Sequence, residues 1–306
     1  MSTPLRSEED IVGFERLGLI GCGLIGGSFA MALRRAQLVR HIVGYSASPG
    51  TTERARQLGV VDATAPSALA AVAGCDIVLL AVPVAATEAT LLAIRDGLEP
   101  GALVMDVGST KGDVVEAARR ALPASQLAHF VPAHPIAGKE VAGVDHAEAS
   151  LFDGRQIVLT PLDVTAPASL QRATDTWSAI GSRVVAMTPD AHDSALAAVS
   201  HLPHLLSFAF INSLAAQSGA PQALSIAGPG FRDFSRIAAS NPAIWRDILL
   251  ANREQVLAHA QAFRATLLGL EALIASGDGP ALESAIAAAR GIRAPWRPGA
   301  LPSSTD

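Results

Sequence analysis

The chain has 306 residues, enough for one large domain or two of ordinary size, and half of them are hydrophobic, so a sizeable core is expected. Aromatic residues make up only 4%, and alanine supplies much of the apolar content, which favours closely packed helices over a thick β-sandwich. The formal net charge is −5, and the sequence has no basic block that could contact phosphates, so nucleic acid is not an expected partner.

The N-terminus and the cysteines bear on the compartment. The first ten residues are polar and acidic, without the apolar core of a signal peptide. The most hydrophobic window, 77–86, is shorter than the roughly 20 apolar residues that a membrane span needs. Cys22 and Cys75 do not make a disulfide framework and are expected to be buried. We therefore expect a cytoplasmic protein that does not associate with a membrane.

The first part of the chain alternates short apolar runs with amphipathic stretches. The runs are typical of strands buried on both faces and cover 17–20, 41–45, 76–82, 102–107 and 129–133. The helical patterns between them cover 24–36, 52–58, 84–97 and 111–122. Two further strand-like runs, 156–160 and 183–187, flank a helical stretch over 166–180. This alternation predicts an α/β fold with a doubly wound, parallel Rossmann-type sheet.

Strand signals cease after Pro189, and the remaining sequence predicts helices only. The expected helices cover 191–217, the neighbourhood of 221–227, and 243–275, the last capped by Asn241 with Pro242 at its first position. The Pro-rich tail from Gly291 is expected to be loosely ordered. We therefore predict a dinucleotide-binding domain over 1–188 and an all-α substrate and dimerisation domain over 189–306.

A glycine-rich turn follows the first predicted strand and opens a helix. Gly21, Gly23 and Gly26 form a G-x-G-x-x-G pattern, in which they allow a tight turn, close approach of a pyrophosphate, and close packing of helix on strand, respectively. The free N–H groups of the helix N-terminus would face the phosphates. This context predicts dinucleotide binding rather than a merely structural turn.

The end of the second strand bears on the choice of dinucleotide. An acid at this place binds the ribose hydroxyls of NAD, but here the residue is Ser46, so no carboxylate repels a 2′-phosphate. Arg54 and Arg56 lie soon after, although a solvated helix face explains them equally well. The sequence therefore favours NADP and leaves NAD open.

Two polar spots follow predicted strands. Ser109 lies in DVGSTK and His134 in PAHPIAGKE, and the carboxyl ends of parallel strands are where ligands bind. A serine hydroxyl and a neutral imidazole are suited to removing hydride from a carbinol, because one orients the hydroxyl and the other accepts its proton. The alternative is that His134 is only a turn histidine before a proline.

The helical part adds further polar residues. His201 and His204 share one helix face and could be metal ligands, but no HExxH motif or cysteine pair accompanies them, so we expect no metal. Arg236 lies in an apolar segment, where its guanidinium needs a carboxylate, either from a ligand or from Asp233 three residues away.

Together these motifs resemble a known family. GLIGCGLIGGS, GSTKG, HPIAGKE, SHLPH and GFRDFSR follow one another as in prephenate and arogenate (cyclohexadienyl) dehydrogenases, and the resemblance covers about residues 15–275. It implies oxidative decarboxylation of a cyclohexadienol with NAD(P), which yields 4-hydroxyphenylpyruvate or tyrosine in tyrosine biosynthesis.

The resemblance also implies roles for individual residues. His134 is similar to the acceptor of the ring hydroxyl's proton, Ser109 to a serine that touches that hydroxyl and the nicotinamide, and Arg236 to an arginine that binds a substrate carboxylate. The remaining substrate residues would be His192, Ser200 and His204 around the side chain, Trp245 at the pocket edge, and Glu140 and Asp233 in a gating ionic network. The expected cofactor contacts are Gly21, Gly23, Leu24, Ile25, Gly26, Ser46, Val82, Pro83 and Ser109.

The sequence departs from the family at Lys139, where relatives have threonine or serine, so the pocket rim is expected to carry a different charge. No chorismate mutase segment precedes the glycine turn, and the tail is too short for a regulatory ACT domain. Any inhibition by tyrosine would therefore act at the active site.

If the pKa of His134 is unperturbed, at about 6.5, we expect the enzyme's activity to fall in acid as His134 takes up a proton.

Two rival functions remain. A β-hydroxyacid dehydrogenase also joins a Rossmann domain to helices, but it uses a lysine of the helical part, and no lysine follows Lys139 here. A non-catalytic nicotinamide sensor would have no use for Ser109 and His134, yet only a turnover assay distinguishes a sensor from an enzyme.

The long apolar helices over 191–217 and 243–275 need partners on several sides, so we expect a homodimer through intertwined helical domains, as in the relatives.

Overall fold

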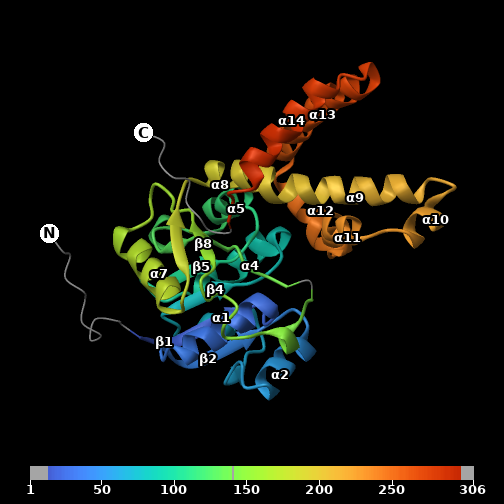
Figure 1. The fold of residues 1–306 in the computed structure, drawn as a ribbon. Helices are drawn as coiled ribbons and strands as arrows, with labels where there is room; N and C mark the ends of the chain where they lie inside the picture. The colour runs from blue at the N-terminus through green and yellow to red at the C-terminus, as the bar shows by residue number, and fades with distance from the viewer. Residues whose placement is uncertain (1–12, 140, 298–306) are drawn as a thin grey trace.

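The computed structural model describes residues 13–139 and 141–297, which form an α/β part followed by a helical part (Figure 1). The helices after β9 extend from the α/β part as two arms, one ending at α10 and the other formed by α13 and α14 (Figure 1). The predicted fold class, a Rossmann-type parallel sheet followed by an all-α domain, is confirmed. The predictions for residues 1–10 and for the chain end after 297 lie outside the described residues.

The main sheet has six parallel strands in the order β3-β2-β1-β4-β5-β6. This order reverses between β1 and β4, so a ligand crevice is expected at their carboxyl ends. The strands are β1 (Phe14–Ile20), β2 (Val39–Tyr45), β3 (Ala63–Thr64), β4 (Ile77–Leu80), β5 (Leu103–Asp106) and β6 (Phe130–Val131). The sequence did not predict β3, because its two residues carry no apolar run.

Helices cover both faces of this sheet (Figure 1). Successive strand residues point to opposite faces, so Leu79 belongs to one hydrophobic cluster with Phe29 and Trp177, and Leu80 to another with Val114. The helices are α1 (Leu24–Arg35), α2 (Pro49–Gln57), α3 (Ala68–Val72), α4 (Thr87–Ile94), α5 (Gly112–Ala121), α6 (Ala124–Leu127) and α7 (Pro167–Ala179), with short 3₁₀ turns η2 (Val84–Ala86), η3 (Arg95–Gly97) and η4 (Val144–His146).

A second sheet has three strands in the order β7-β8-β9, namely β7 (Ala133–Pro135), β8 (Gln156–Leu159) and β9 (Arg183–Ala186). β7 is antiparallel to β8, and β8 is parallel to β9. The prediction of one strand over 129–133 is therefore wrong: Pro132, which has no N–H to donate, separates β6 from β7. His134 lies inside β7 rather than beyond the end of a parallel strand.

The helical part comprises α8 (Pro189–Leu196), a π-helical turn η5 (Ala197–His201), α9 (Leu202–Ala215), α10 (Ala220–Ser225), α11 (Pro229–Ser235), η6 (Arg236–Ala239), α12 (Pro242–Ala251), α13 (Arg253–Ser276) and α14 (Gly279–Arg293). Asn241 caps α12 as predicted, its side chain accepting from two backbone N–H groups. The prediction of one helix over 243–275 is wrong, because Asn252 breaks it. The loose tail predicted from Gly291 is wrong as far as Arg293, where α14 ends.

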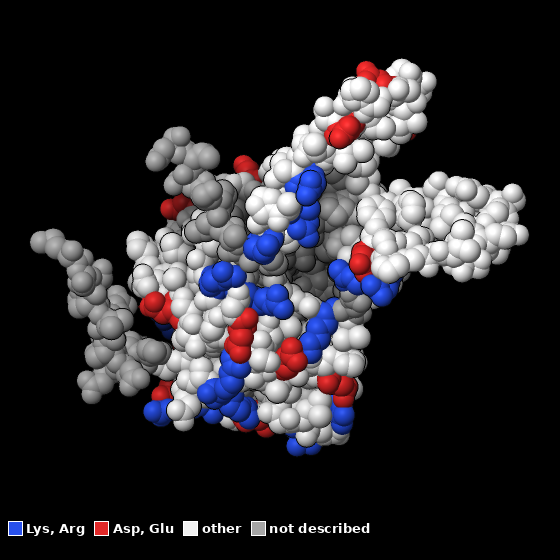
Figure 2. Space-filling view, viewed as in Figure 1, with Lys and Arg blue, Asp and Glu red and all other residues white. Residues whose placement is uncertain are grey.

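The helical arms expose apolar side chains. Val199, Ile226 and Ile292 are 74%, 86% and 80% exposed, and the arm of α9 and α10 carries few charges in the space-filling view (Figure 2). The continuous stretch Pro189–Ala215 has 27 residues and contains an 18-residue window with a mean hydropathy of 1.5, enough by length and composition for a membrane span, and only 22% of that window is buried. This stretch is longer than 77–86, the window expected from the sequence to be the most hydrophobic. Its exposed apolar face needs a covering partner.

Candidate active site

The glycine turn joins β1 to α1 at the carboxyl edge of the main sheet. Gly21 has φ +99°, and a Cβ there would lie 2.2 Å from the carbonyl oxygen of Ala81, so only glycine fits. A Cβ on Gly26 would lie 2.2 Å from the Gly21 oxygen. A Cβ on Gly23 would meet nothing within 4 Å, so the protein's own packing does not require this glycine. The open side of Gly23, at the N-terminus of α1, fits the pyrophosphate of a dinucleotide.

The other predicted cofactor residues lie along the same edge. Ile20, Tyr45, Leu80 and Asp106 are in register across β1, β2, β4 and β5, and Ser46, Val82, Pro83 and Ser109 follow shortly after these strands. Leu24 and Ile25 begin α1, and Leu24 is buried. The tertiary structure thus gathers the predicted cofactor contacts at one edge.

Ser46 is tied to the glycine turn. Its Oγ accepts a hydrogen bond of 2.8 Å from the backbone N–H of Cys22. The two arginines considered for a 2′-phosphate are already paired: Arg54 Nε donates to Asp145 Oδ1 at 2.8 Å, and Arg56 Nε to Glu53 Oε2 at 2.9 Å. Both guanidinium groups thus have carboxylate partners in this structure, whereas Ser46 places no carboxylate at the end of β2.

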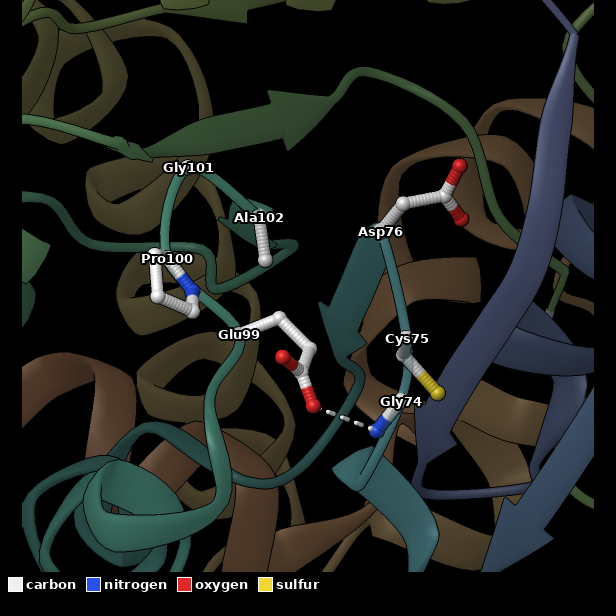
Figure 3. A pocket seen from close by; sticks show the side chains of 7 residues that line it. All are labelled: Gly74, Cys75, Asp76, Glu99, Pro100, Gly101 and Ala102. Atoms are coloured by element: carbon white, nitrogen blue, oxygen red, sulfur yellow. Dashed lines mark hydrogen bonds between the residues drawn. The ribbon is translucent and has the colours of Figure 1, made fainter.

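A shallow pocket lies at the opposite end of β4 and β5, bounded by 74–76 and 99–102 (Figure 3). Glu99 reaches across it and accepts a hydrogen bond of 3.1 Å from the N–H of Gly74 (Figure 3). Asp76 points away from Glu99 and binds the N–H groups of Glu15 and Arg16 at 3.0 and 2.9 Å. These contacts brace strand ends, and because ligands bind at the carboxyl ends of parallel strands, the candidate site lies at the other edge.

The turn that carries Ser109 is built on a buried charge pair. Asp106, the last residue of β5, binds the ammonium of Lys111 and accepts from the N–H of Gly108 at 2.7 Å. Lys111 is fully buried, and Ser109 between them is half-buried. The main chain around Ser109 is therefore fixed by this pair.

His134 lies in β7 and contacts the helical part. Its Nδ1 lies 2.8 Å from Nε2 of His192 in α8, and the two rings meet edge to face with centroids 5.0 Å apart. Burial, and then the neighbouring charges of His192, Lys111 and His201, hold the pKa of His134 well below its ordinary value of 6.5. His134 is therefore neutral near pH 7, the state that a proton acceptor needs.

His192 differs from its predicted role beside the substrate. It is fully buried, and both of its ring nitrogens are used, Nε2 by His134 and Nδ1 by Asp193 at 2.8 Å. It has no polar atom left for a substrate, so it lies behind His134. Asp193 was not among the predicted site residues, although a carboxylate directly after a histidine in a predicted helix was a usable signal.

The π-helical turn and α9 present a second group of rings. His204 stacks on Trp245 of α12 with centroids 3.4 Å apart and an interplanar angle of 19°, and its Nδ1 donates to the carbonyl of Ser200 at 2.9 Å. Burial, and then the charge of Arg236, lower the pKa of His204. Ser200, His204, Trp245 and Arg236 thus lie in one neighbourhood, as the sequence analysis expected, and α12 packs against η2 near Val82.

His201 belongs to the packing rather than to an open site. It is buried, its Nδ1 lies 3.1 Å from Nδ2 of Asn252, and burial lowers its pKa to about 4. Because His201 and His204 each have a protein partner, they do not form a ligand pair. Within residues 13–139 and 141–297, no group of three His, Cys, Asp or Glu side chains could hold a metal ion.

Family models match both parts of the chain. Residues 29–186 match "Prephenate dehydrogenase, nucleotide-binding domain", and residues 188–288 match "Prephenate dehydrogenase, dimerization domain". The chain belongs to the prephenate dehydrogenase family.

Individual members of the family agree in sequence and in structure. Prephenate dehydrogenase of Bacillus subtilis is 35% identical over 244 residues, 78% of this chain but only 64% of that protein, so the chain spans less than two thirds of this relative. Cyclohexadienyl dehydrogenase of Zymomonas mobilis is 35% identical over 269 residues, 87% of this chain and 90% of that one. The structure of Aquifex aeolicus prephenate dehydrogenase in complex with hydroxyphenyl propionate and NAD⁺ aligns with a TM-score of 0.86 at 33% identity, covering 92% and 98% of the two chains.

Three residues of this prephenate dehydrogenase family member were expected at the rim of the pocket, namely Lys139, Glu140 and Asp233. Glu140 lies outside the described residues. Asp233 contacts its neighbour Arg232 at 3.1 Å. Lys139, the departure from the family pattern, forms an ion pair of 2.8 Å with Glu148, so its charge is balanced locally and adds less to the rim than expected.

Proposed function

We propose that the chain is an NAD(P)-dependent prephenate and/or arogenate dehydrogenase, which oxidatively decarboxylates a cyclohexadienol to 4-hydroxyphenylpyruvate or tyrosine. The observation that carries the proposal is His134, kept neutral and anchored through Nδ1, so that Nε2 is the nitrogen left for a substrate hydroxyl. Membership of the prephenate dehydrogenase family and the glycine turn beside Ser46 support the same function.

The reaction can be written with these residues in place. A bound nicotinamide dinucleotide would accept the hydride from the ring carbon that bears the hydroxyl. Ser109 orients that hydroxyl, and Nε2 of His134 takes its proton while the O–H electron pair forms a carbonyl. When the ring carboxylate leaves as CO₂, its bonding electrons make the ring aromatic, and the phenolate oxygen takes the proton back from His134. No proton is consumed overall, and the enzyme's main tasks are alignment and proton transfer.

Substrate binding is assigned to the group around Trp245. We propose that Arg236 binds a substrate carboxylate, that Ser200 and His204 lie near the side chain, and that Trp245 forms the pocket edge. Asp233 and Glu140 are proposed for the ionic network at the rim. The face between the α/β part and the helical arms is hollowed and has Lys and Arg side chains around the hollow, a setting that favours an anionic ligand (Figure 2).

For the cofactor, we propose that both NADP and NAD bind, with NADP used at least as well. Ser46 places no carboxylate against a 2′-phosphate, which supports NADP. The pairing of Arg54 with Asp145 and of Arg56 with Glu53 leaves no preformed arginine clamp for that phosphate, which keeps NAD competitive.

We propose a homodimer through the helical part, with the domain boundary near residue 188. The match to a dimerization domain over residues 188–288 and the exposed apolar side chains of α9, α13 and α14 support it. A second copy would cover the apolar face of Pro189–Ala215, so a membrane is not needed to explain that helix. The free, buried Cys22 and Cys75 are compatible with the cytoplasmic location that we propose.

The deciding experiment is steady-state kinetics with prephenate and arogenate, each with NAD⁺ and NADP⁺. We expect reduced nicotinamide and CO₂ to form in equal amounts with at least one pair. If the dinucleotide binds but neither substrate is turned over, the chain is a nicotinamide-binding sensor. Turnover of a simple β-hydroxyacid instead would point to the rival dehydrogenase.

A further inference from the structure

Behind His134 lies a chain of hydrogen bonds that ends on a carboxylate. His134 Nδ1 meets His192 Nε2 at 2.8 Å, and His192 Nδ1 meets Asp193 Oδ1 at 2.8 Å. His192 is fully buried, and Asp193 is 8% exposed, so water does not compete for these bonds. The chain crosses from β7 to α8, two elements that the sequence places 58 residues apart.

The positions of the protons in this hydrogen-bond chain follow from the carboxylate of Asp193 at its end. A carboxylate only accepts, so His192 donates its Nδ1–H to Asp193. With its one ring proton on Nδ1, His192 has a lone pair on Nε2 and accepts there, so His134 carries its proton on Nδ1 and donates. The lone pair of His134 is thereby placed on Nε2, the nitrogen that meets the substrate.

We propose that His192 and Asp193 are positioning residues that set the tautomer and the orientation of His134, and that Asp193 stabilises the positive charge while His134 holds the substrate's proton. This inference rests on the proposed function. No step beyond the proton transfer already described is added: the hydroxyl O–H breaks, the His134 Nε2–H forms, and the same proton returns to the product.

Asp193 has a second set of partners that links it to the Ser109 turn. Its Oδ1 accepts from the N–H of Lys111 and its Oδ2 from the N–H of Gly112, both at 2.8 Å. A Cβ on Gly112 would lie 3.0 Å from Oδ2, so this glycine permits the close approach. The backbone carbonyl of Asp193 is in turn held by Asn252 Nδ2 at 2.7 Å. One residue of the helical part therefore positions both the turn of Ser109 and the ring of His134.

The test is Asp193→Asn, which puts an N–H₂ where Oδ1 now accepts from His192 and from the N–H of Lys111, and keeps an oxygen for the N–H of Gly112. His192 would then accept at Nδ1 and donate from Nε2, and His134 would carry its proton on Nε2, where no base remains. We expect kcat to fall about 10³- to 10⁴-fold, as when the carboxylate behind a catalytic histidine becomes an amide in a serine protease. The KM for the substrate and the Kd for the cofactor should stay within about threefold, because Asp193 contacts neither.

A spectroscopic readout separates this role from a structural one. With ring-¹⁵N-labelled histidine in the full-length protein, the His134 signal, assigned by its loss in His134→Gln, should show the Nδ1–H form in the parent and the Nε2–H form in Asp193→Asn. This measurement needs no turnover. It therefore tests the role of His192 and Asp193 even if the proposed substrates are not turned over and the proposed function fails.

Two further variants complete the design. Asp193→Glu keeps a carboxylate and should recover at least tenfold in kcat over Asp193→Asn. Asp190→Asn, an exposed acid on the same helix α8, should behave as the parent protein. The inference is overturned if Asp193→Asn keeps the parent's kcat, or if the tautomer of His134 is the same in both proteins.

Discussion

The ammonium of Lys111 is hydrogen-bonded to the carboxylate of Asp106, and neither side chain is more than 3% exposed. Nζ also donates to the carbonyl oxygen of Ala133 at 2.9 Å, and Asp106 Oδ1 accepts from the N–H of Ala133 at 3.1 Å. The pair therefore holds the start of β7, next to His134, against the end of β5. Of the two lysines in the chain, one serves this buried contact.

We expect Lys111→Met to lower the free energy of unfolding by about 3–5 kcal/mol, because it leaves the Asp106 carboxylate buried and uncompensated. Chemical denaturation at fixed protein concentration measures the change. The matched control is Arg119→Met on α5, whose ion pair with Asp163 (3.0 Å) is exposed and should matter little. Equal costs for the two variants would show that the buried pair is not what holds β7.

The pH profile should show a base with a depressed pKa. His134 must be neutral to accept a proton, and burial, followed by the charges of His192, Lys111 and His201, lowers its pKa well below 6.5. A lowered pKa keeps the neutral form present to lower pH, so kcat/KM should stay high through pH 6.5 and fall only well below it. This corrects the value of about 6.5 expected for an unperturbed imidazole. An acid limb at or above pH 6.5 would contradict the structure.

His134→Asn tests whether that limb belongs to His134. We expect kcat to fall by orders of magnitude with cofactor affinity retained, since a general base contributes about 10²- to 10⁴-fold. Ser109→Ala should cost less, because the proton acceptor remains. Near-normal turnover in His134→Asn would remove His134 from the mechanism and leave the turn-histidine interpretation.

Arg236→Gln should raise the KM of the anionic substrate by about 10- to 100-fold, the range of a lost charge-assisted hydrogen bond, with a smaller change in kcat. Arg232→Gln is the control, because Arg232 is exposed and contacts Asp233. The alternative from the sequence, an ion pair of Arg236 with Asp233, predicts lower thermal stability with unchanged KM. Kinetics and thermal melts of both variants decide between the two.

Ser46→Asp should shift the preference from NADP⁺ to NAD⁺. The new carboxylate would repel a 2′-phosphate and accept hydrogen bonds from the ribose hydroxyls of NAD⁺. The ratio of kcat/KM for the two cofactors measures the shift, and Ser46→Ala controls for the loss of the bond from the Cys22 N–H. A parent protein that strongly prefers NAD⁺ would show that Ser46 does not favour NADP⁺.

The assembly should be an obligate homodimer. Its interface should bury well over about 2,000 Å² in total, as obligate interfaces do, with exposed apolar residues such as Leu250 and Leu268 as candidates for burial. Light scattering at micromolar concentration measures the mass, and Leu268→Glu should weaken the dimer and the activity together. A stable monomer with full activity would refute it.

The elements whose causes are local could be predicted from the sequence. Buried parallel strands such as β4 need continuous apolar runs, the turn at Gly21 needs a residue that tolerates φ +99°, and Asn241-Pro242 starts a helix wherever the chain goes. These features also predicted the fold class and the dinucleotide-binding turn. The family motifs indicated Ser109, His134 and Arg236 as candidate site residues. Each of these features and motifs depends on residues within a few positions of one another.

The contacts behind these candidate residues could not be predicted, because they join residues far apart in the sequence. His134 and His192, which are in contact, lie 58 residues apart in the sequence, and Lys111 and Asp193 lie 82 residues apart. At such separations the pattern of a single sequence does not predict which residues pair. The division at Pro132, which puts His134 in a second sheet, depends on pairing with β8. The tertiary structure also sets the pKa of His134: a half-buried histidine near the Lys111 ammonium stays neutral to lower pH, because desolvation and a nearby positive charge both penalise its charged form.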